Sequence, residues 1–300
     1  MAVWHSHVGI VVDDMGKALP YWTKVLGFKP VRSIELLADR PKAGSPLDGV
    51  RGQVHWLRHG DTQIELLDLA NRKDRRVNMG ARDVHASHQG FYTDSMEKHY
   101  ERLKAHGTWF LATPEGVSTI HGKDPDGNWL QLVRTSITAS IPRSQLPVDR
   151  TGFGHAHSAL AVNRMDDAVP FYRDLMGMEL EKWQVVEPSR FAGTPLEGVR
   201  LQEVWLRTGN FMLELIEYGN RQDVKLDMDV MDVHATHIAF FCDDLQQEHA
   251  RLKAAGIWFR DEPGGARGDP LRCAWGKDPD GNWFELTALP ADGKGALPKP

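Results

Sequence analysis

The sequence contains the same segments twice, in the same order, over nearly all of its 300 residues. The opening HSHVGIVVDDM returns as HAHSALAVNRM, and the later QVHWLRHGDTQIELLDL returns as QEVWLRTGNFMLELIEY. DVHASH returns as DVHATH, and KDPDGNW stands unchanged in both copies. This repeat period is much longer than that of a solenoid or a propeller, so each copy is expected to be a domain with its own core.

The boundaries of the copies follow from composition. We expect one domain over residues 1–140 and a second over residues 150–290, joined by a polar stretch between Arg134 and Phe153 that contains two prolines. The last residues, 291–300, have the composition of a disordered tail.

Charge and composition exclude several classes of partner. The net charge of −5 and the scattered Lys and Arg residues argue against a nucleic acid as the principal partner. No apolar run approaches the roughly 20 residues that cross a bilayer, and the N-terminus has no signal-peptide pattern. We therefore expect a cytoplasmic protein, monomeric or homodimeric, that binds neither nucleic acid nor membrane and takes a small-molecule substrate.

Cysteine usage limits the metal chemistry. Cys242 and Cys273 are the only cysteines, which is too few for a disulfide framework or a thiolate cage. Any metal would have to be held by histidine and carboxylate side chains.

Each copy divides into two similar modules of one strand, one helix and several further strands. In the first module, His7 to Val12 alternates as a strand, and Asp13 or Asp14 offers an N-cap for a helix from Lys17 to Leu26. Pro20 fits that helix only if it lies in the first turn. The shared DPDGN segments have the composition of a turn that orients the last strand of a module.

Polar residues interrupt the inward face of several predicted strands at matching positions of the two copies. They are His157, Glu214, His237 and Glu285 in the second copy, and His7, Glu65, His88 and Gln131 in the first. Inward polar groups need a partner, and imidazoles and carboxylates that converge on a divalent cation neutralise one another. Two histidines with a carboxylate are typical ligands of non-haem iron and related centres.

These strands, together with the helix motifs YWTKVLGF and FYRDLMGM and the KDPDGNW turns, resemble the vicinal oxygen chelate superfamily. That superfamily includes glyoxalase I, methylmalonyl-CoA epimerase, extradiol dioxygenases and bleomycin resistance proteins. The resemblance implies an α+β fold of paired βαβββ modules, whose curved mixed sheets enclose a metal that holds a substrate through two adjacent oxygens.

The resemblance also implies a ligand set. His157, His237 and Glu285 correspond to the usual ligands, and Glu214 corresponds to a fourth that could also act as the catalytic base. Relatives build the cavity either within one copy or between copies, and the second arrangement would combine His7, Glu65, His237 and Glu285. The first copy has the neutral Gln131 in place of Glu285. One divalent metal is expected, and Fe, Mn, Ni, Co and Zn all remain open.

Three reactions or roles stay open. Proton transfer in an isomerase or lyase is favoured by Glu214 as a base. Extradiol ring cleavage is less favoured, because Trp275 stands where such relatives carry a tyrosine, and the only histidine between His237 and Glu285 is His249, on a predicted helix. A metal-free binding or resistance protein would be expected to have lost the ligands.

Further paired features have weaker assignments. The repeated histidines His85 and His234 are expected to stabilise a turn rather than line a site. His5 and His155 precede the first-strand histidines by two residues and could support them or be exposed. The segment GGARGDPLRCAW could offer Arg267 or Arg272 to an anionic substrate, although a solvated loop is the preferred interpretation.

Overall fold

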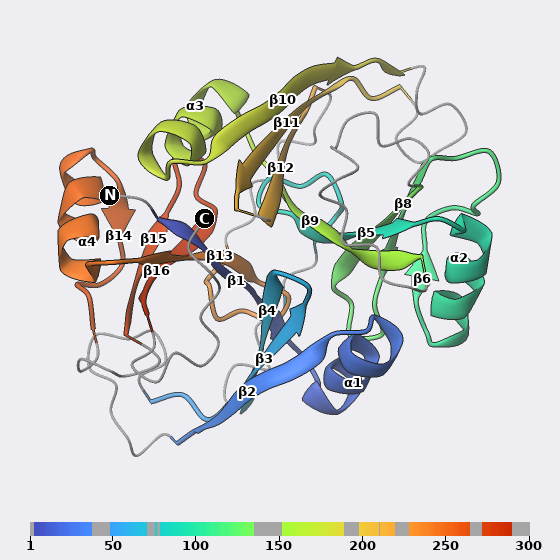
Figure 1. Cartoon of the computed structure of the whole chain (residues 1–300), viewed down its shortest axis with the longest axis horizontal. Coiled ribbons are helices and arrows are strands. Elements are labelled where there is room, and N and C mark those ends of the chain that lie inside the picture. The colour runs from blue at the N-terminus through green and yellow to red at the C-terminus, as the bar shows by residue number, and fades with distance from the viewer. Residues whose placement is uncertain are drawn as a thin grey trace.

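The chain forms two mixed β-sheets that lie side by side, with helices packed outside them (Figure 1). The computed structural model describes residues 3–37, 49–70, 76, 79–134, 152–188, 198–209, 211–219, 228–264 and 272–289. Most of the predicted linker, the C-terminal tail and Arg267 lie outside the described residues. The α+β fold of βαβββ modules predicted from the sequence is confirmed.

Four modules of one design follow one another along the chain. Module 1 consists of β1 (Trp4–Val12), α1 (Met15–Pro20), β2 (Lys29–Leu36), β3 (Gly52–His59) and β4 (Thr62–Leu69). Module 2 consists of β5 (Ser87–Thr93), α2 (Met96–Ala105), β6 (Trp109–Phe110), β7 (Thr119–Lys123) and β8 (Trp129–Arg134).

The second copy repeats this order. Module 3 consists of β9 (Phe153–Ala161), α3 (Met165–Pro170), β10 (Glu179–Val186), β11 (Leu201–Thr208) and β12 (Phe211–Tyr218). Module 4 consists of β13 (Thr236–Cys242), α4 (Leu245–Ala254), β14 (Trp258–Phe259), β15 (Cys273–Lys277) and β16 (Trp283–Ala288).

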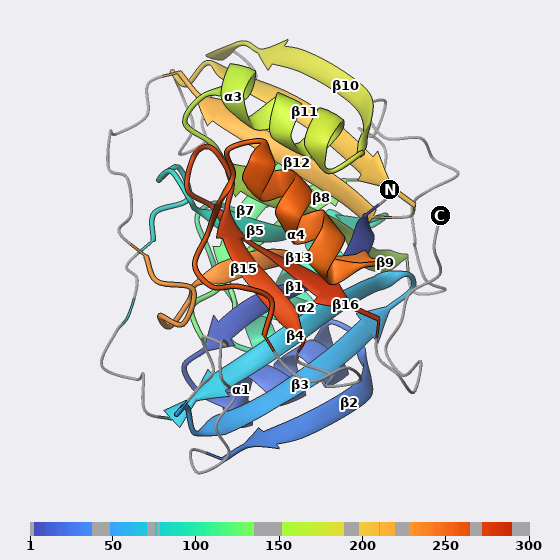
Figure 2. The same cartoon turned by 90° about the vertical axis from the view of Figure 1, so that its left-hand side faces the viewer.

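Each sheet combines one module from each copy. The first sheet has the order β14-β15-β16-β13-β1-β4-β3-β2, and the second has the order β10-β11-β12-β9-β5-β8-β7-β6. Module 4 therefore pairs with module 1 through the antiparallel strands β1 and β13, and module 2 pairs with module 3 through β5 and β9. Figure 2 shows β15, β16 and β13 from the end of the chain running beside β1 and β4 from its beginning. The border between the two copies does not coincide with the border between the sheets.

The first helix differs from its prediction at the proline. Asp14 is the N-cap, as one of the two predicted alternatives, and its side chain accepts a hydrogen bond from the Gly16 backbone. Pro20 is the last residue of α1 rather than part of its first turn, and a π-helical turn follows over Tyr21–Val25. Proline cannot donate to the carbonyl four residues earlier, and a wider turn accommodates this loss. The same arrangement occurs at Pro170, followed by Phe171–Leu175.

The two modules of one copy contact each other outside the sheets. Arg102 in the second half of α2 donates a hydrogen bond to the carbonyl oxygen of Val25 at 2.5 Å. Arg251 of α4 donates one to the carbonyl oxygen of Leu175 at 2.6 Å. The DPDGN turns add to this contact, because Asp126 accepts from the backbone of Asp13 at 2.7 Å. Each copy is thus held together through helices and turns, whereas its strands join the other copy.

His85 and His234 stabilise turns, as predicted. Their backbones lie in the left-handed region, with φ of 77° and 72°. His85 Nε2 lies 2.8 Å from the carbonyl oxygen of Asp280, and His234 Nε2 lies 2.7 Å from that of Asp126. Each histidine therefore connects one sheet to the DPDGN turn of the other sheet. Within the described residues, no helix is both long enough and apolar enough to span a bilayer.

Candidate functional site

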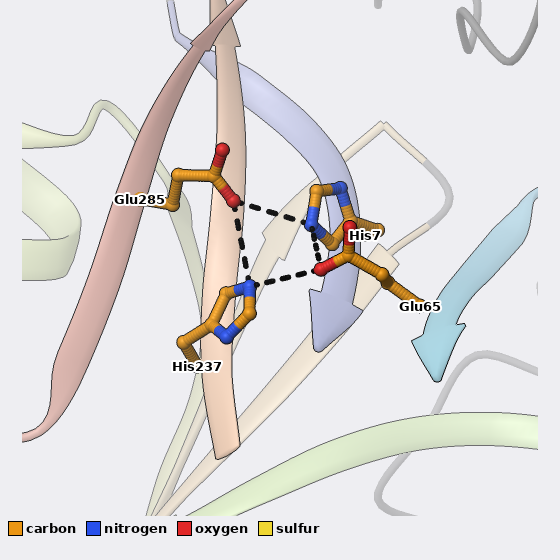
Figure 3. A group of neighbouring side chains, drawn as sticks. All are labelled: His7, Glu65, His237 and Glu285. Carbon is orange, nitrogen blue, oxygen red and sulfur yellow. Dashed lines mark ion pairs between the residues drawn. The ribbon is translucent and has the colours of Figure 1, made fainter. Parts of the chain in front are cut away.

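A cluster of four buried side chains, which we call site A, lies on the four central strands of the first sheet. His7 comes from β1, Glu65 from β4, His237 from β13 and Glu285 from β16. Strand pairing sets their positions: Gly9 of β1 lies opposite both Glu65 and His237, and Ala239 of β13 lies opposite Glu285. All four side chains point toward one another (Figure 3).

The four donor atoms of site A surround one point. His7 Nε2 lies 3.2 Å from Glu65 Oε2 and 3.3 Å from Glu285 Oε2. His237 Nε2 lies 3.5 Å from Glu65 Oε2 and 3.4 Å from Glu285 Oε2. Although all four residues are buried, neither Nε2 atom has a hydrogen-bond partner with acceptable geometry. Buried polar atoms are rarely left in this state, so the arrangement fits donors that share a cation.

Electrostatics agree with that fit. Burial disfavours the charged form of His7, but Glu65 and Glu285 outweigh burial and raise the pKa of its imidazole. Burial likewise disfavours the carboxylate of Glu65, but His7 and His237 outweigh it and lower the pKa of this group. The two carboxylates together carry two negative charges, which a divalent cation would balance with both imidazoles neutral.

The surroundings of site A hold its histidines in place. Ser6 Oγ lies 3.0 Å from His7 Nδ1, which leaves Nε2 directed at the carboxylates. The edge of the His237 ring packs against Trp275, with 4.4 Å between ring centroids. A Cβ at Gly9 would lie 1.9 Å from His237 Cε1, so only glycine leaves space for this ring.

The equivalent place in the second sheet holds a different cluster, which we call site B. It consists of His88 on β5, His157 on β9 and Glu214 on β12, with Gln131 on β8 where site A has Glu285. His157 Nε2 and His88 Nε2 lie 3.3 Å and 3.7 Å from Glu214 Oε2. The donor atoms of these three residues all lie within 4.8 Å of one another.

The charge state of site B is the opposite of that at site A. Burial lowers the pKa of His157 to about 3, and burial together with neighbouring histidines lowers that of His88. Burial raises the pKa of Glu214 to about 8. Without a ligand, site B therefore consists of neutral imidazoles and a protonated carboxyl group near neutral pH.

The structure separates the ligand set that the sequence assigned to the second copy. His237 and Glu285 lie in site A, whereas His157 and Glu214 lie in site B, because the strands of one copy belong to different sheets. Glu214, expected to be both ligand and base, therefore does not face Glu285. The four residues of the alternative between copies, His7, Glu65, His237 and Glu285, are the ones that come together.

Other predicted residues belong to neither cluster of donors. His5 stacks on Phe211 with 3.6 Å between ring centroids, and His155 Nε2 lies 3.0 Å from Gln89 Oε1. His249 lies on α4 and packs against Phe259. Arg272 precedes β15, and its carbonyl accepts from the Ala288 backbone. None of these side chains is among the clustered donors of the described residues.

Two residues near site B were not singled out from the sequence. His121 of β7 pairs across the hairpin with Gln131, and its ring lies 4.9 Å from that of His88. Glu203 of β11 has its pKa raised to about 7 by burial and by Glu214. Both lie on the inner face of the second sheet, because His121 is opposite Gln131, and Glu203 is two residues from Trp205, which is opposite Glu214. Comparison of Glu203 with its counterpart Val54 in the first copy was the available signal.

The family-model comparison matches residues 4–132 and 154–286 to "Glyoxalase/Bleomycin resistance protein/Dioxygenase superfamily". The chain belongs to this superfamily. The match covers both copies, so the resemblance seen in the strand and turn motifs is confirmed.

Individual proteins resemble the chain in sequence or in fold. A protein from Vibrio cholerae named "Probable lactoylglutathione lyase" is 28% identical over 136 residues, covering 43% of this chain and 86% of that protein. The crystal structure of glyoxalase I from Zea mays has a TM-score of 0.62 at 18% identity, covering 95% of this chain and 92% of that one. A candidate dioxygenase from Bacillus subtilis has a TM-score of 0.61 at 14% identity, covering 100% of this chain and 92% of that one.

Proposed function

We propose that the protein is a divalent-metal-dependent enzyme that acts at site A on a small substrate with two adjacent oxygens, by glyoxalase-like or epimerase-like proton transfer. The observation that carries this proposal is the convergence of two imidazoles and two carboxylates, all buried, with Nε2 atoms that lack hydrogen bonds. A buried set of this kind is expensive without a cation, since several kcal/mol attach to each uncompensated charge.

The residues of site A match what Fe, Mn, Ni, Co or Zn would require. His7 and His237 would supply imidazole nitrogen, and Glu65 and Glu285 would supply carboxylate oxygen. When bound, such an ion supplies Lewis-acid polarisation of a substrate oxygen and so acidifies the neighbouring C–H bond.

Within this frame, Glu65 is the better candidate for the base that moves the proton. It stands at the position in its copy that Glu214 has in the other, and it lies on β4 opposite Trp56. Oε2 of each carboxylate faces both imidazoles, but Glu285 also has the thiol of Cys273 against its side chain, so Glu285 would stay in place. A carboxylate that holds a proton at one oxygen can return it to an adjacent carbon.

The surroundings of site A favour proton transfer over ring cleavage. Trp275, whose indole N–H points to Cys273 at 3.1 Å, offers no acid or base where ring-cleaving relatives carry a tyrosine. Among the described residues, the donors around site A include no third histidine. The name of the Vibrio cholerae relative, a lyase acting on a lactoyl thioester of glutathione, makes thiol adducts of 2-oxo aldehydes the first substrates to test. Action in the cytoplasm belongs to the same proposal.

Metal analysis and isotope exchange test this proposal. The purified chain should contain a divalent metal, and in deuterated solvent it should exchange the proton beside the carbonyl of 2-oxo aldehyde thiol adducts or acyl thioesters. His237→Ala should remove both the metal of site A and the exchange. Arg173→Ala is a suitable control, because that exposed side chain pairs with Asp174 and belongs to neither cluster.

Oxygen uptake with catechols or hydroquinones separates the second reaction class. Uptake that depends on His237, without solvent exchange, would replace proton transfer by oxygenation. A metal-free protein whose activity survives His237→Ala would end the enzymatic proposal for site A.

A further inference from the structure

Site B has its own unsatisfied donors, and they do not depend on site A. His88 Nε2, both ring nitrogens of His157 and Glu214 Oε2 are buried without a hydrogen-bond partner. A buried polar atom without a partner destabilises the fold unless a ligand satisfies it. We propose that site B is a second metal centre, which binds a divalent transition-metal ion through only His88, His157 and Glu214.

The backbone leaves space for this donor set. A Cβ at Gly90 would lie 2.0 Å from Cε1 of His157 and 2.4 Å from its two ring nitrogens. At site B, the glycine that leaves space for an imidazole is Gly90 on β5, opposite His157 of the other copy. At site A it is Gly9 on β1, opposite His237 of the other copy.

The donor types select the ion. Two imidazoles with one carboxylate suit Fe, Co, Ni or Zn, whereas Mg and Ca prefer sets made wholly of oxygen. Gln131 cannot supply the second negative charge that Glu285 supplies at site A. The amide nitrogen of Gln131 instead lies 3.2 Å from Nε2 of His121 on β7, so the Gln131 side chain is bonded to that histidine.

Fewer protein ligands leave more positions for other ligands. Around site B, the hydroxyl of Tyr92 and the indole nitrogen of Trp205 are also buried without hydrogen-bond partners, and both rings pack against His157. These two donors could hold oxygen ligands of the ion. Glu203 adds a second carboxyl group on the same face, electrostatically coupled to Glu214.

Cobalt titration of the full chain after chelator treatment tests the second centre. We expect two equivalents of Co²⁺ per chain by competition with a chromophoric chelator, the second bound at least about tenfold more weakly because it lacks one carboxylate. Glu214→Gln should remove the weaker equivalent and leave the stronger one. The matched variant Glu65→Gln should weaken the stronger equivalent and leave the weaker one.

Two further measurements keep the test decisive. Circular dichroism of Glu214→Gln should match that of the metal-free wild type, which separates loss of the ion from loss of the fold. Gln131→Glu should tighten the weaker equivalent at least about tenfold. A single equivalent that Glu65→Gln weakens, two equivalents retained in Glu214→Gln, or an unchanged affinity in Gln131→Glu would each overturn the second centre. A single equivalent that Glu214→Gln removes would instead count against site A alone.

Discussion

Sites A and B occupy equivalent strands of two equivalent sheets, yet their side chains have opposite electrostatic states. Site A has charged imidazole and carboxylate groups that compensate one another, whereas site B has neutral imidazoles and a protonated Glu214. The main sequence difference among the donors is Glu285 against Gln131. The cluster with a second carboxylate on the last strand of its module is ionic, and the cluster with an amide there is neutral.

The largest expected effect comes from giving site A the residue of site B. Glu285→Gln removes one of the two carboxylates that balance a divalent ion, so turnover should fall by at least about 100-fold, equivalent to about 3 kcal/mol. Steady-state kinetics with the substrate found by the exchange assay measure it. If turnover stays within about threefold of the wild type, the second carboxylate of site A does not contribute to catalysis.

The positions of the site A residues on their strands could be predicted from the sequence, but the pairing of the modules could not. Strand alternation placed His7, Glu65, His237 and Glu285 on inward faces, and the repeat aligned them with their counterparts. Which modules share a sheet could not be predicted, because the first strand of every module, β1, β5, β9 and β13, is buried along its full length and its sequence does not distinguish one partner strand from another. The π-helical turn after Pro20 also had no sequence signal beyond the proline itself.

The two glycines beside the histidine rings give the next largest effects. Gly9→Ala and Gly90→Ala place a methyl group about 2 Å from His237 and His157 respectively, and overpacking of this kind costs about 1–3 kcal/mol. Gly9→Ala should impair site A only, and Gly90→Ala site B only. Chemical denaturation and metal stoichiometry of both variants check this selectivity. Ala159→Gly, at the position equivalent to Gly9, is the matched control.

Stability of the metal-free protein should respond to pH in opposite directions at the two sites. The raised pKa of Glu214 contributes stability below its ordinary value, and this is lost as the pH rises through about 8. The lowered pKa of Glu65 contributes stability above its ordinary value, and this is lost as the pH falls below it.

Glu214→Gln should therefore flatten the alkaline side of the stability profile and Glu65→Gln the acidic side, each by at least about 1 kcal/mol. Urea denaturation of chelator-treated protein from about pH 2 to about pH 9 measures both, because the contribution of Glu65 is lost as the pH falls toward about 2. Parallel profiles for the two variants would contradict the assigned charge states.

The smallest effects belong to the histidines that connect the sheets. His85→Asn and His234→Asn keep a residue that tolerates a positive φ but lose the bonds to the carbonyls of Asp280 and Asp126. Each should lower the free energy of unfolding by about 1 kcal/mol, without changing metal stoichiometry. Unequal losses in the two variants would show that the sheets are not energetically equivalent.

The pairing of β1 with β13 and of β5 with β9 has a consequence for the ancestry of the chain. A single copy of this repeat has half of each sheet and would need a second copy beside it, as two identical subunits do in a dimer. Fusion in one chain keeps both halves present in equal amounts and at high effective concentration. It also allowed the two clusters to diverge in sequence, because a mutation in one copy now changes only one cluster. A residue such as Gln131 could therefore arise without removing the only complete set of ligands.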